Sequence, residues 1–416
     1  MRYITGRHTL LLLLTVALTL LTSCSDDADT HRRQVRMELR PYAWAYDEVG
    51  QPTATRGDDP EPWDPTPLGY YLFSDLYDLF PNQTNLLTEN TISVYFTHGK
   101  EDDEGAIADG QFIYVPAEEK WYASFDLPES GATHYLYGFI PYMRGVSATL
   151  TAKTKDGVKN FSNGTTMVIS GLPSVTVTDV CAVVGVQKGL NVAPDHDADA
   201  GGNRLRMGKF DYTLGGENDP NHIFLLFDHL YSALRLKLRV DAKYDKLRTI
   251  RLKSLKLIAY NGNTAFKSKT TATIELHPTE NGNTSPIGSI SFVPDGSSPD
   301  MTSESLFKPA EGQDGINLTT EYTDFRGCFV PFGSPDFTIE SIYDVYDKNK
   351  SDDFPNGNLI RQNCKAQNKI DLDRIFLESE SVRGKMYTLN MTVNPTYLYM
   401  LSEPDLDNPT ITLSNE

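Results

Sequence analysis

The clearest pattern along the chain is the strict alternation of apolar and basic residues from Leu234 to Val240. Leucine or valine occupies every second position, and Arg235, Lys237 and Arg239 occupy the positions between them. Because successive side chains of a β-strand point to opposite faces, this alternation predicts a strand with one buried and one solvated face. Such a strand is typical of an antiparallel sheet that packs on one side of a core.

The next apolar segment, 247–260, keeps the alternation but changes its phase. Ile250 and Leu252 share one phase, whereas the apolar residues from Leu255 onward take the other. A slip of one residue turns every following side chain to the opposite face of a sheet. The sequence therefore predicts a β-bulge near Lys253-Ser254.

Other short runs rich in Thr, Val, Tyr and Ile are separated by Gly, Asn, Asp and Pro, which is typical of an all-β chain. Strands are predicted at 93–96, 111–115, 121–127, 134–141 and 387–393. Residues 117–120 are expected to form a hairpin loop. The pattern at 224–231 fits either a helical turn or the lead-in to the strand at 234–240.

A polar, glycine-rich stretch between Lys188 and Asn221 indicates where the chain divides into domains. The expected N-terminal β-sandwich domain covers 35–200, and the expected C-terminal one covers 201–416. Both have an ordinary domain size. The predicted fold class is therefore all-β, with two tandem antiparallel β-sandwich domains.

Charge and motifs narrow the possible functions. The formal net charge of −18 disfavours binding to nucleic acid, because an acidic surface repels phosphate backbones. The chain has no HExxH, GxSxG, GxGxxG or GxxxxGK[ST] motif. Asp195, Asp197 and Asp199 have calcium-loop spacing, but Ala200 and Arg206 replace the expected glycine and acid, so a linker is preferred. No enzymatic activity, cofactor or metal site is expected.

The cysteines do not form a paired framework. Beyond Cys24 there are Cys181, Cys328 and Cys364, an odd number without a CxxC motif. Cys328–Cys364 is the more plausible disulfide, although the sequence leaves open whether it forms. Cys181 lies in an apolar run and is interpreted as a small buried hydrophobic residue.

The N-terminus indicates export. An apolar run of twelve residues, Leu10 to Leu21, is too short to span a membrane but fits a signal peptide over 1–23. Leu21-Thr22-Ser23-Cys24 resembles a bacterial lipobox, which implies lipidation of Cys24 and attachment to the outer membrane. The alternative is an ordinary secretory signal with an incidental cysteine. The acidic run Ser25–Asp29 resembles a surface-export signal of Bacteroidetes lipoproteins, or is a solvated tether.

Four further motifs, in this order along the chain, resemble segments of the Bacteroidetes fimbrillin family. They are His134–Tyr142, Val175–Val184 with Thr178-Asp179, Phe227-Asp228-His229 before the alternating strand, and Gly384–Val393. Together with the lipobox, the resemblance covers essentially the whole chain. It implies two β-sandwich domains of Greek-key or transthyretin-like type in a type V pilus subunit. Its partners would be other fimbrial subunits and a host or bacterial surface ligand.

The resemblance also implies assembly by donor-strand exchange, in which an arginine-specific protease removes the N-terminal segment and a neighbouring subunit fills the vacated groove. In this chain the removable strand would lie in segment 24–57, at Val35, Met37 and Leu39. Arg56-Gly57 matches the processing site, although Arg32, Arg33, Arg36 and Arg40 compete and Arg56 also fits a solvated loop. Ile411 and Leu413 form a candidate donor strand, which could equally pair within its own sheet.

Two alternatives stay open from the sequence. The chain could remain lipidated and serve as a pilus anchor, which leaves the stalk, tip and anchor positions undecided. It could also be a glycan-binding surface lipoprotein that never polymerises, with aromatic residues stacking on sugars. The candidate aromatic pairs are Tyr70-Tyr71, Trp121-Tyr122 and Tyr397 with Tyr399. Core packing is the more ordinary role of such residues.

Overall fold

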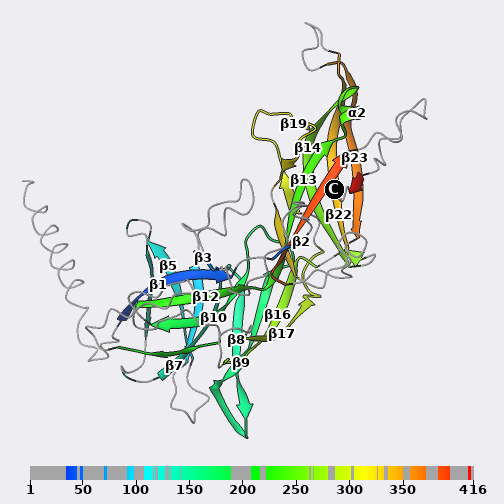
Figure 1. Ribbon diagram of the computed structural model, residues 1–416. Coiled ribbons are helices and arrows are strands. Elements are labelled where there is room, and N and C mark those ends of the chain that lie inside the picture. Colours follow the sequence, from blue (N-terminus) through cyan, green and yellow to red (C-terminus); the bar gives the residue numbers. More distant parts are fainter. Residues whose placement is uncertain are drawn as a thin grey trace, which may run out of the picture. The chain divides into compact units, whose positions relative to one another are not determined.

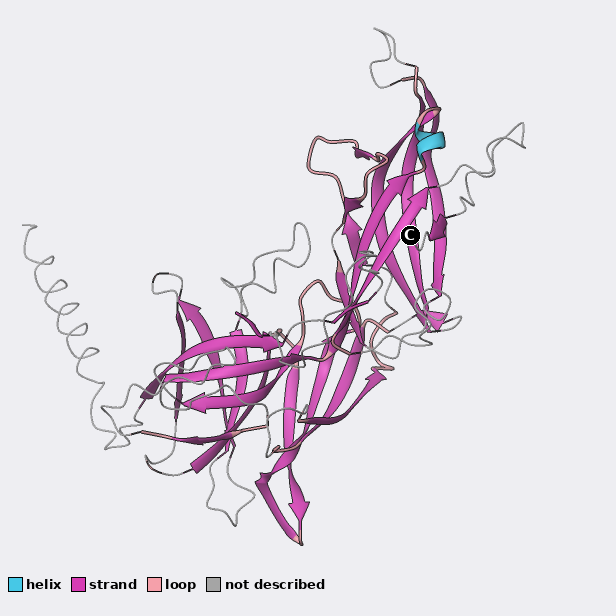
Figure 2. Cartoon of the chain, in the orientation of Figure 1, coloured by secondary structure: helices cyan, strands magenta, loops and turns pink. Residues whose placement is uncertain are grey.

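Strands make up most of the described chain in the computed structural model, and helix is almost absent from it (Figures 1 and 2). The structure describes residues 34–44, 47–49, 70–72, 91–97, 107–115, 117, 120–126, 131, 133–140, 142–188, 208–215, 222–261, 264–265, 267–279, 286–300, 304–325, 327–331, 336–349, 357–371, 383–393 and 411–413. Within these ranges the single helix is α2 (Ala242–Asp245), which Asp241 caps by accepting two backbone N–H groups. No helix in these ranges is long and apolar enough to cross a membrane. The predicted all-β fold class is confirmed.

The first sheet has nine strands and closes on itself. Its members are β1 (Gln34–Trp44), β3 (Tyr70–Leu72), β4 (Thr91–Thr97), β5 (Ile107–Val115), β6 (Lys120–Asp126), β7 (Thr133–Ile140), β10 (Cys181–Lys188), β11 (Asp211–Thr213) and β12 (His222–His229). Seven of them follow the order β10-β12-β1-β6-β5-β4-β7. The start of β10 also pairs with β7, with Cys181 opposite Ile140, so the two ends of this order meet in a ring. We call these seven strands the strand ring.

A four-stranded sheet packs against part of the strand ring. It has the order β17-β16-β9-β8, where β8 is Ser147–Lys155, β9 Val158–Pro173, β16 Lys269–Leu276 and β17 Ile287–Pro294. Tyr137 and Phe139 of β7 share one buried cluster with Met167 of β9 and Ile274 of β16. Burial of these apolar faces holds the sheet and the ring strands together.

Two six-stranded sheets enclose a second core. One contains β2 (Asp47–Val49), β13 (Tyr231–Val240), β20 (Thr323–Asp324), β21 (Cys328–Pro331), β24 (Lys385–Val393) and β25 (Ile411–Leu413). The other contains β14 (Arg248–Asn261), β15 (Thr264–Ala265), β18 (Glu304–Phe307), β19 (Ile316–Asn317), β22 (Asp336–Asp347) and β23 (Leu359–Asp371). Leu236 of β13, Leu389 of β24, Leu255 of β14 and Val345 of β22 belong to the same buried cluster, so the two sheets form a sandwich.

The predictions made for β13 and β14 agree with the structure. In β13 the apolar positions from Leu234 onward are buried and the basic positions are only half-buried. The predicted bulge is confirmed, because the register between β14 and β22 shifts between Leu252 and Ser254. The segment 224–231, which the sequence left open, is strand β12 followed directly by β13.

One expectation needs correction, and the structure answers one open question. The sheets are not purely antiparallel, because β1 with β12, β13 with β24 and β2 with β24 pair in parallel. Each of these pairs joins segments far apart along the chain, and parallel strands need such long connections. The candidate disulfide Cys328–Cys364, which the sequence left open, is absent: neither cysteine is in a disulfide, and the two side chains fill the second core from its two opposite sheets.

Strand pairing crosses the predicted boundary at residue 200. In the four-stranded sheet, β9 pairs with β16, and in the strand ring β10 pairs with β12. The two sides of residue 200 therefore share two sheets. The division into 35–200 and 201–416 stays a prediction.

Candidate functional site

The N-terminal strand β1 lies beside β12 in the strand ring (Figure 1), and β6 is its neighbour on the other side. It runs parallel to β12, with Glu38 opposite His222 and Ala43 opposite Phe227. Val35, Met37 and Leu39 lie in this strand. No hairpin joins β1 to β12, since about 180 residues separate them in the sequence. The candidate removable strand is thus a complete member of the sheet, held there by pairing and not by a short turn.

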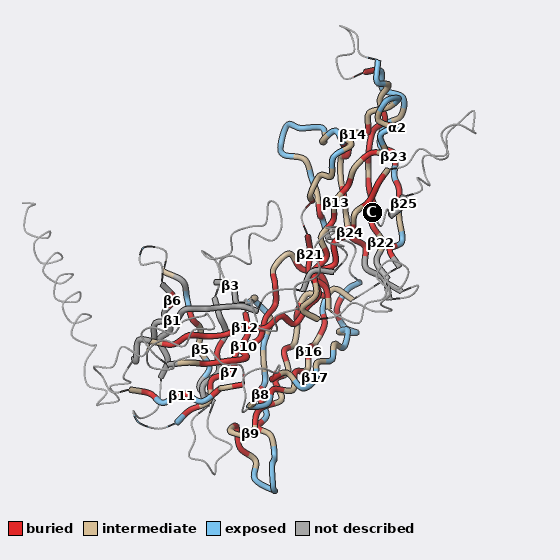
Figure 3. Tube along the Cα trace, viewed as in Figure 1, coloured by how far each residue is buried: buried red, intermediate tan, exposed pale blue. Residues whose placement is uncertain are grey.

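The strand beside it, β12, is buried almost throughout. From Ile223 to His229 every residue is buried, so both faces of the strand are covered (Figure 3). Its other edge pairs with β10 from Ile223 to His229. Without β1, the β12 backbone groups on the facing edge would lack partners, and unsatisfied buried backbone groups cost about 1–3 kcal/mol each.

The C-terminal strand β25 pairs in antiparallel fashion with β24, with Ile411 opposite Val393 and Leu413 opposite Met391. This pairing covers three residues, whereas β1 has eleven. The sequence left open whether the candidate donor strand pairs within its own sheet or with a neighbouring subunit. In this structure it pairs within its own sheet. Its donation to a neighbour stays a prediction.

The other predicted functional residues lie outside the described residues. They are Cys24, with the leader before it, and the candidate processing site Arg56-Gly57. The glycan-binding aromatic residues are divided: Tyr70 and Tyr71 lie in β3, Trp121 in β6 is buried at 3% exposure, and Tyr397 and Tyr399 lie outside the described residues.

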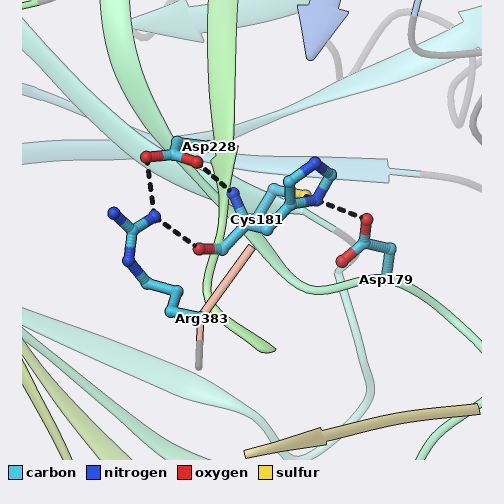
Figure 4. A network of polar contacts seen from close by, with 5 residues as sticks. Asp179, Cys181, Asp228 and Arg383 are labelled. Atoms are coloured by element: carbon cyan, nitrogen blue, oxygen red, sulfur yellow. Dashed lines mark hydrogen bonds and ion pairs between the residues drawn. The ribbon is translucent and has the colours of Figure 1, made fainter. Parts of the chain in front are cut away.

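A buried polar network lies where β10 begins and β12 ends (Figure 4). His229 and Cys181 are opposite residues of the paired strands, and Asp179 comes two residues before Cys181. His229 Nδ1 lies 2.7 Å from Asp179 Oδ2 and 3.4 Å from Cys181 Sγ. Each of the three side chains is at most 1% exposed. We call Asp179, Cys181 and His229 the buried triad.

The geometry of the buried triad does not fit a nucleophilic relay. In such a relay the acid holds one imidazole nitrogen while the nucleophile uses the other. Here Asp179 and Cys181 both approach Nδ1. Burial raises the pKa of the Cys181 thiol well above its usual value, and the carboxylates of Asp179 and Asp228 raise it further. The thiol is therefore protonated at neutral pH, and it is enclosed, so it is not a nucleophile.

A second layer of polar contacts connects the buried triad to the sandwich. Asp228 accepts the backbone N–H of His229 at 2.8 Å and a hydrogen bond from Arg383 Nη1 at 2.7 Å. The same Arg383 nitrogen donates to the carbonyl oxygen of His229 at 2.9 Å. The neighbouring Gly384, at φ +70°, donates its N–H to the carbonyl of Tyr231. Arg383-Gly384 is the turn that begins β24, so this layer joins the end of β12 to the start of β24.

The sequence did not predict this convergence. Thr178-Asp179, Phe227-Asp228-His229 and Gly384 belong to three separate family-like motifs, and nothing in the sequence links one motif to another. The interpretation of Cys181 as buried is confirmed, but its polar neighbours were missed. His229 lies about 50 residues from Asp179 and Cys181 along the chain, and no spacing rule links an Asp-x-Cys pair to a distant histidine. Only the pairing of β10 with β12 brings them together.

Comparison with known proteins places the chain near solved fimbrial structures. No protein-family model and no curated protein matches the chain. Among solved structures it is similar to a fimbrial protein from Bacteroides vulgatus, with 13% identity, a TM-score of 0.35, and 80% of this chain and 93% of that one covered. It is also similar to the tip fimbrial protein Mfa3 of Porphyromonas gingivalis with C-terminal truncation, with 8% identity, a TM-score of 0.30, and 91% and 98% covered.

Both of these solved structures are fimbrial proteins. Because the TM-scores are below 0.5, the function proposed below rests on the sequence motifs and the strand pairing rather than on this similarity.

Proposed function

We propose that this chain is a structural and adhesive subunit of a cell-surface fimbria that assembles by donor-strand exchange. It is exported as a lipoprotein through Cys24, and proteolysis after Arg56 then removes β1 together with the lipid. The gap left between β12 and β6 accepts a strand from a neighbouring subunit. The observation that carries the proposal is the place of β1 inside the strand ring, parallel to β12 and between two strands that would both lose a partner.

Three features support strand replacement at this place. The ring is otherwise closed through β7 and β10, so loss of β1 opens it at a single position. Residues 223–229 of β12 are buried on both faces, so an uncovered edge there lies beside apolar surface. A free edge of this kind pairs readily with an extended segment of another chain. The segment with Ile411 and Leu413 is the proposed donor, since it gives up only three paired residues on release.

Truncation tests the exchange directly. We expect a chain that begins at Gly57 to form oligomers that resist sodium dodecyl sulfate, because each vacated ring takes a neighbour's strand. A synthetic peptide of residues 34–44 should restore the monomer by refilling the gap, and a scrambled peptide of the same composition should not. A chain of residues 57–409, which lacks the donor segment, should bind the peptide but form no oligomers.

The exchange would be excluded if the chain beginning at Gly57 stayed a folded monomer with the melting temperature of the full chain. Mass spectrometry of the N-terminus on the native cell surface distinguishes the positions in a fimbria. A start at Gly57 indicates a stalk or tip subunit, whereas a lipid retained on Cys24 indicates an anchor.

A further inference from the structure

We propose that Asp179, Cys181 and His229 bind one structural zinc ion. The three side chains offer a carboxylate oxygen, a sulfur and an imidazole nitrogen, and these ligand atoms all lie within 4.8 Å of one another. Among the described residues this is the one group of three or more metal-binding side chains gathered in this way. The proposal does not depend on strand exchange.

One distance between the ligand atoms already fits zinc, and a second requires a small adjustment. Zinc bonds of about 2.3 Å to sulfur and about 2.0–2.2 Å to nitrogen and oxygen place the ligands of a tetrahedral ion about 3.3–3.6 Å apart. The Cys181 Sγ to His229 Nδ1 distance is 3.4 Å, within this range. The His229 Nδ1 to Asp179 Oδ2 distance is 2.7 Å, so the carboxylate has to withdraw by about half an ångström to admit the ion.

The chemistry of the ligands selects the metal. A thiolate excludes the hard ions Ca²⁺ and Mg²⁺, which take oxygen ligands, while a mixture of sulfur, nitrogen and oxygen is typical of zinc. On binding, the Cys181 thiol releases its proton to solvent and becomes a thiolate. The thiolate and the Asp179 carboxylate then balance the two positive charges of the ion. A fully buried site is thereby left without net charge.

The surroundings already hold the ligands in place. The Asp228 carboxylate is bound to the His229 N–H and to Arg383, so it is neutralised and does not compete for the ion. The same contacts fix the backbone from which the imidazole projects. Such outer contacts orient metal ligands and contribute to affinity. Three protein ligands leave one tetrahedral position for a water molecule, and because the ligands are at most 1% exposed, the ion would enter during folding.

The site lies at the closure of the strand ring. Cys181 is opposite His229 of β12 and also opposite Ile140 of β7, so an ion on Cys181 and His229 would join β10 to β12 beside the point where β10 meets β7. Metal bound only by the folded chain adds its binding free energy to folding. Zinc would thus stabilise the pairing of β10 with β12 next to the ring closure.

Metal analysis of the full chain tests the proposal. Protein folded in the presence of zinc and then desalted should retain about one zinc per chain, and chelator should remove it only after unfolding. Zinc at about 100 times its dissociation constant should raise the melting temperature by about 5 °C or more. Cobalt in place of zinc should give the intense thiolate-to-cobalt absorption band, which reports a Cys–metal bond in the unmodified chain and needs no variant.

The two other buried cysteines provide matched controls. Cys181→Ser should abolish the cobalt band and most of the zinc, while Cys328→Ser and Cys364→Ser, each of which also removes a buried thiol, should retain both. The proposal is wrong if the wild-type chain folded with zinc carries none and shows no cobalt band. It is equally wrong if Cys328→Ser loses as much metal as Cys181→Ser, and the triad is then a hydrogen-bonded network only.

Discussion

β12 and β13 are consecutive strands separated only by Leu230, yet they are buried in different ways. β12 is buried on both faces from Ile223 onward, whereas β13 alternates between buried apolar and half-buried basic residues from Leu234 onward. The difference follows from their surroundings. β12 lies between β10 and β1 in the strand ring, and β13 forms one face of the sandwich. Burial is thus decided by the layer that a strand joins: it is two-sided through β12 and the first residues of β13, and it alternates from Leu234 onward.

β12 and β13 also differ in how far the ion pairs on them are exposed to water. The carboxylate of Asp228 near the end of β12 is bound by Arg383 and is 7% exposed. On β13, Arg235 holds Asp324, which is 31% exposed, through contacts of 3.2 and 3.0 Å. The two arginine side chains are equally exposed, at 24%. They differ mainly in whether the partner acid has access to water, and this makes them a matched pair for experiment.

The largest expected effect tests the two-sided burial of β12. Leu225→Ala and Leu226→Ala, on opposite faces, should each lower the free energy of unfolding by about 2–5 kcal/mol, because both leucines are fully buried. On β13, Leu236→Ala should cost a similar amount and Lys237→Ala less than about 1 kcal/mol. Denaturant titration gives all four values. A small effect at either Leu225 or Leu226 would contradict burial on both faces.

The next effect tests the charge contrast. Arg383→Met should cost about 2–3 kcal/mol, because it leaves the buried Asp228 carboxylate without its cation; the cost falls below that of a fully buried pair since Arg383 is partly exposed. Arg235→Met should cost only about 0.5–1 kcal/mol, as for other exposed pairs. A double-mutant cycle of Arg383→Met with Asp228→Asn should show strong coupling. If Arg383→Met and Arg235→Met lowered the free energy of unfolding equally, burial of the partner acid would not explain the difference between the two ion pairs.

The smallest effect concerns pH at the first residue of β13. Tyr231 is fully buried, its hydroxyl donates to the carbonyl of Pro173 at 2.7 Å, and burial raises its pKa above the usual value of about 10. Above pH 10 the unfolded chain therefore loses a proton that the folded chain keeps. Stability falls by about 1.4 kcal/mol per pH unit from this group.

Tyr231→Phe should make the decline of stability above pH 10 shallower by that amount, as measured by denaturant titration across the alkaline range. Burial likewise raises the pKa of Tyr137, whose hydroxyl donates to the carbonyl of Phe161. Tyr137→Phe should give a second reduction of the same size. An unchanged slope in both variants would show that these hydroxyls ionise alike in the folded and unfolded chains.

Much of the local structure followed from the sequence. The alternation at 234–240 gave the strand and its buried face, and the change of phase after Leu252 gave the bulge. These features depend on the two-residue period of a strand, which is a property of neighbouring residues. The segment 224–231 was undecided because a run buried on both faces shows no period that separates strand from helix.

By itself the sequence determined the all-β class, the positions of β4 to β7, β13, β14 and β24, and the alternation within β1, because side-chain periodicity and turn residues act over a few positions. Only the tertiary structure decided that β1 lies between β12 and β6, that sheets are shared across residue 200, and that Asp179, Cys181 and His229 meet. These are contacts between segments far apart along the chain. They depend on which strand edges pair with each other. The residues of one strand do not specify its distant pairing partner, so this pairing could not be predicted from the sequence.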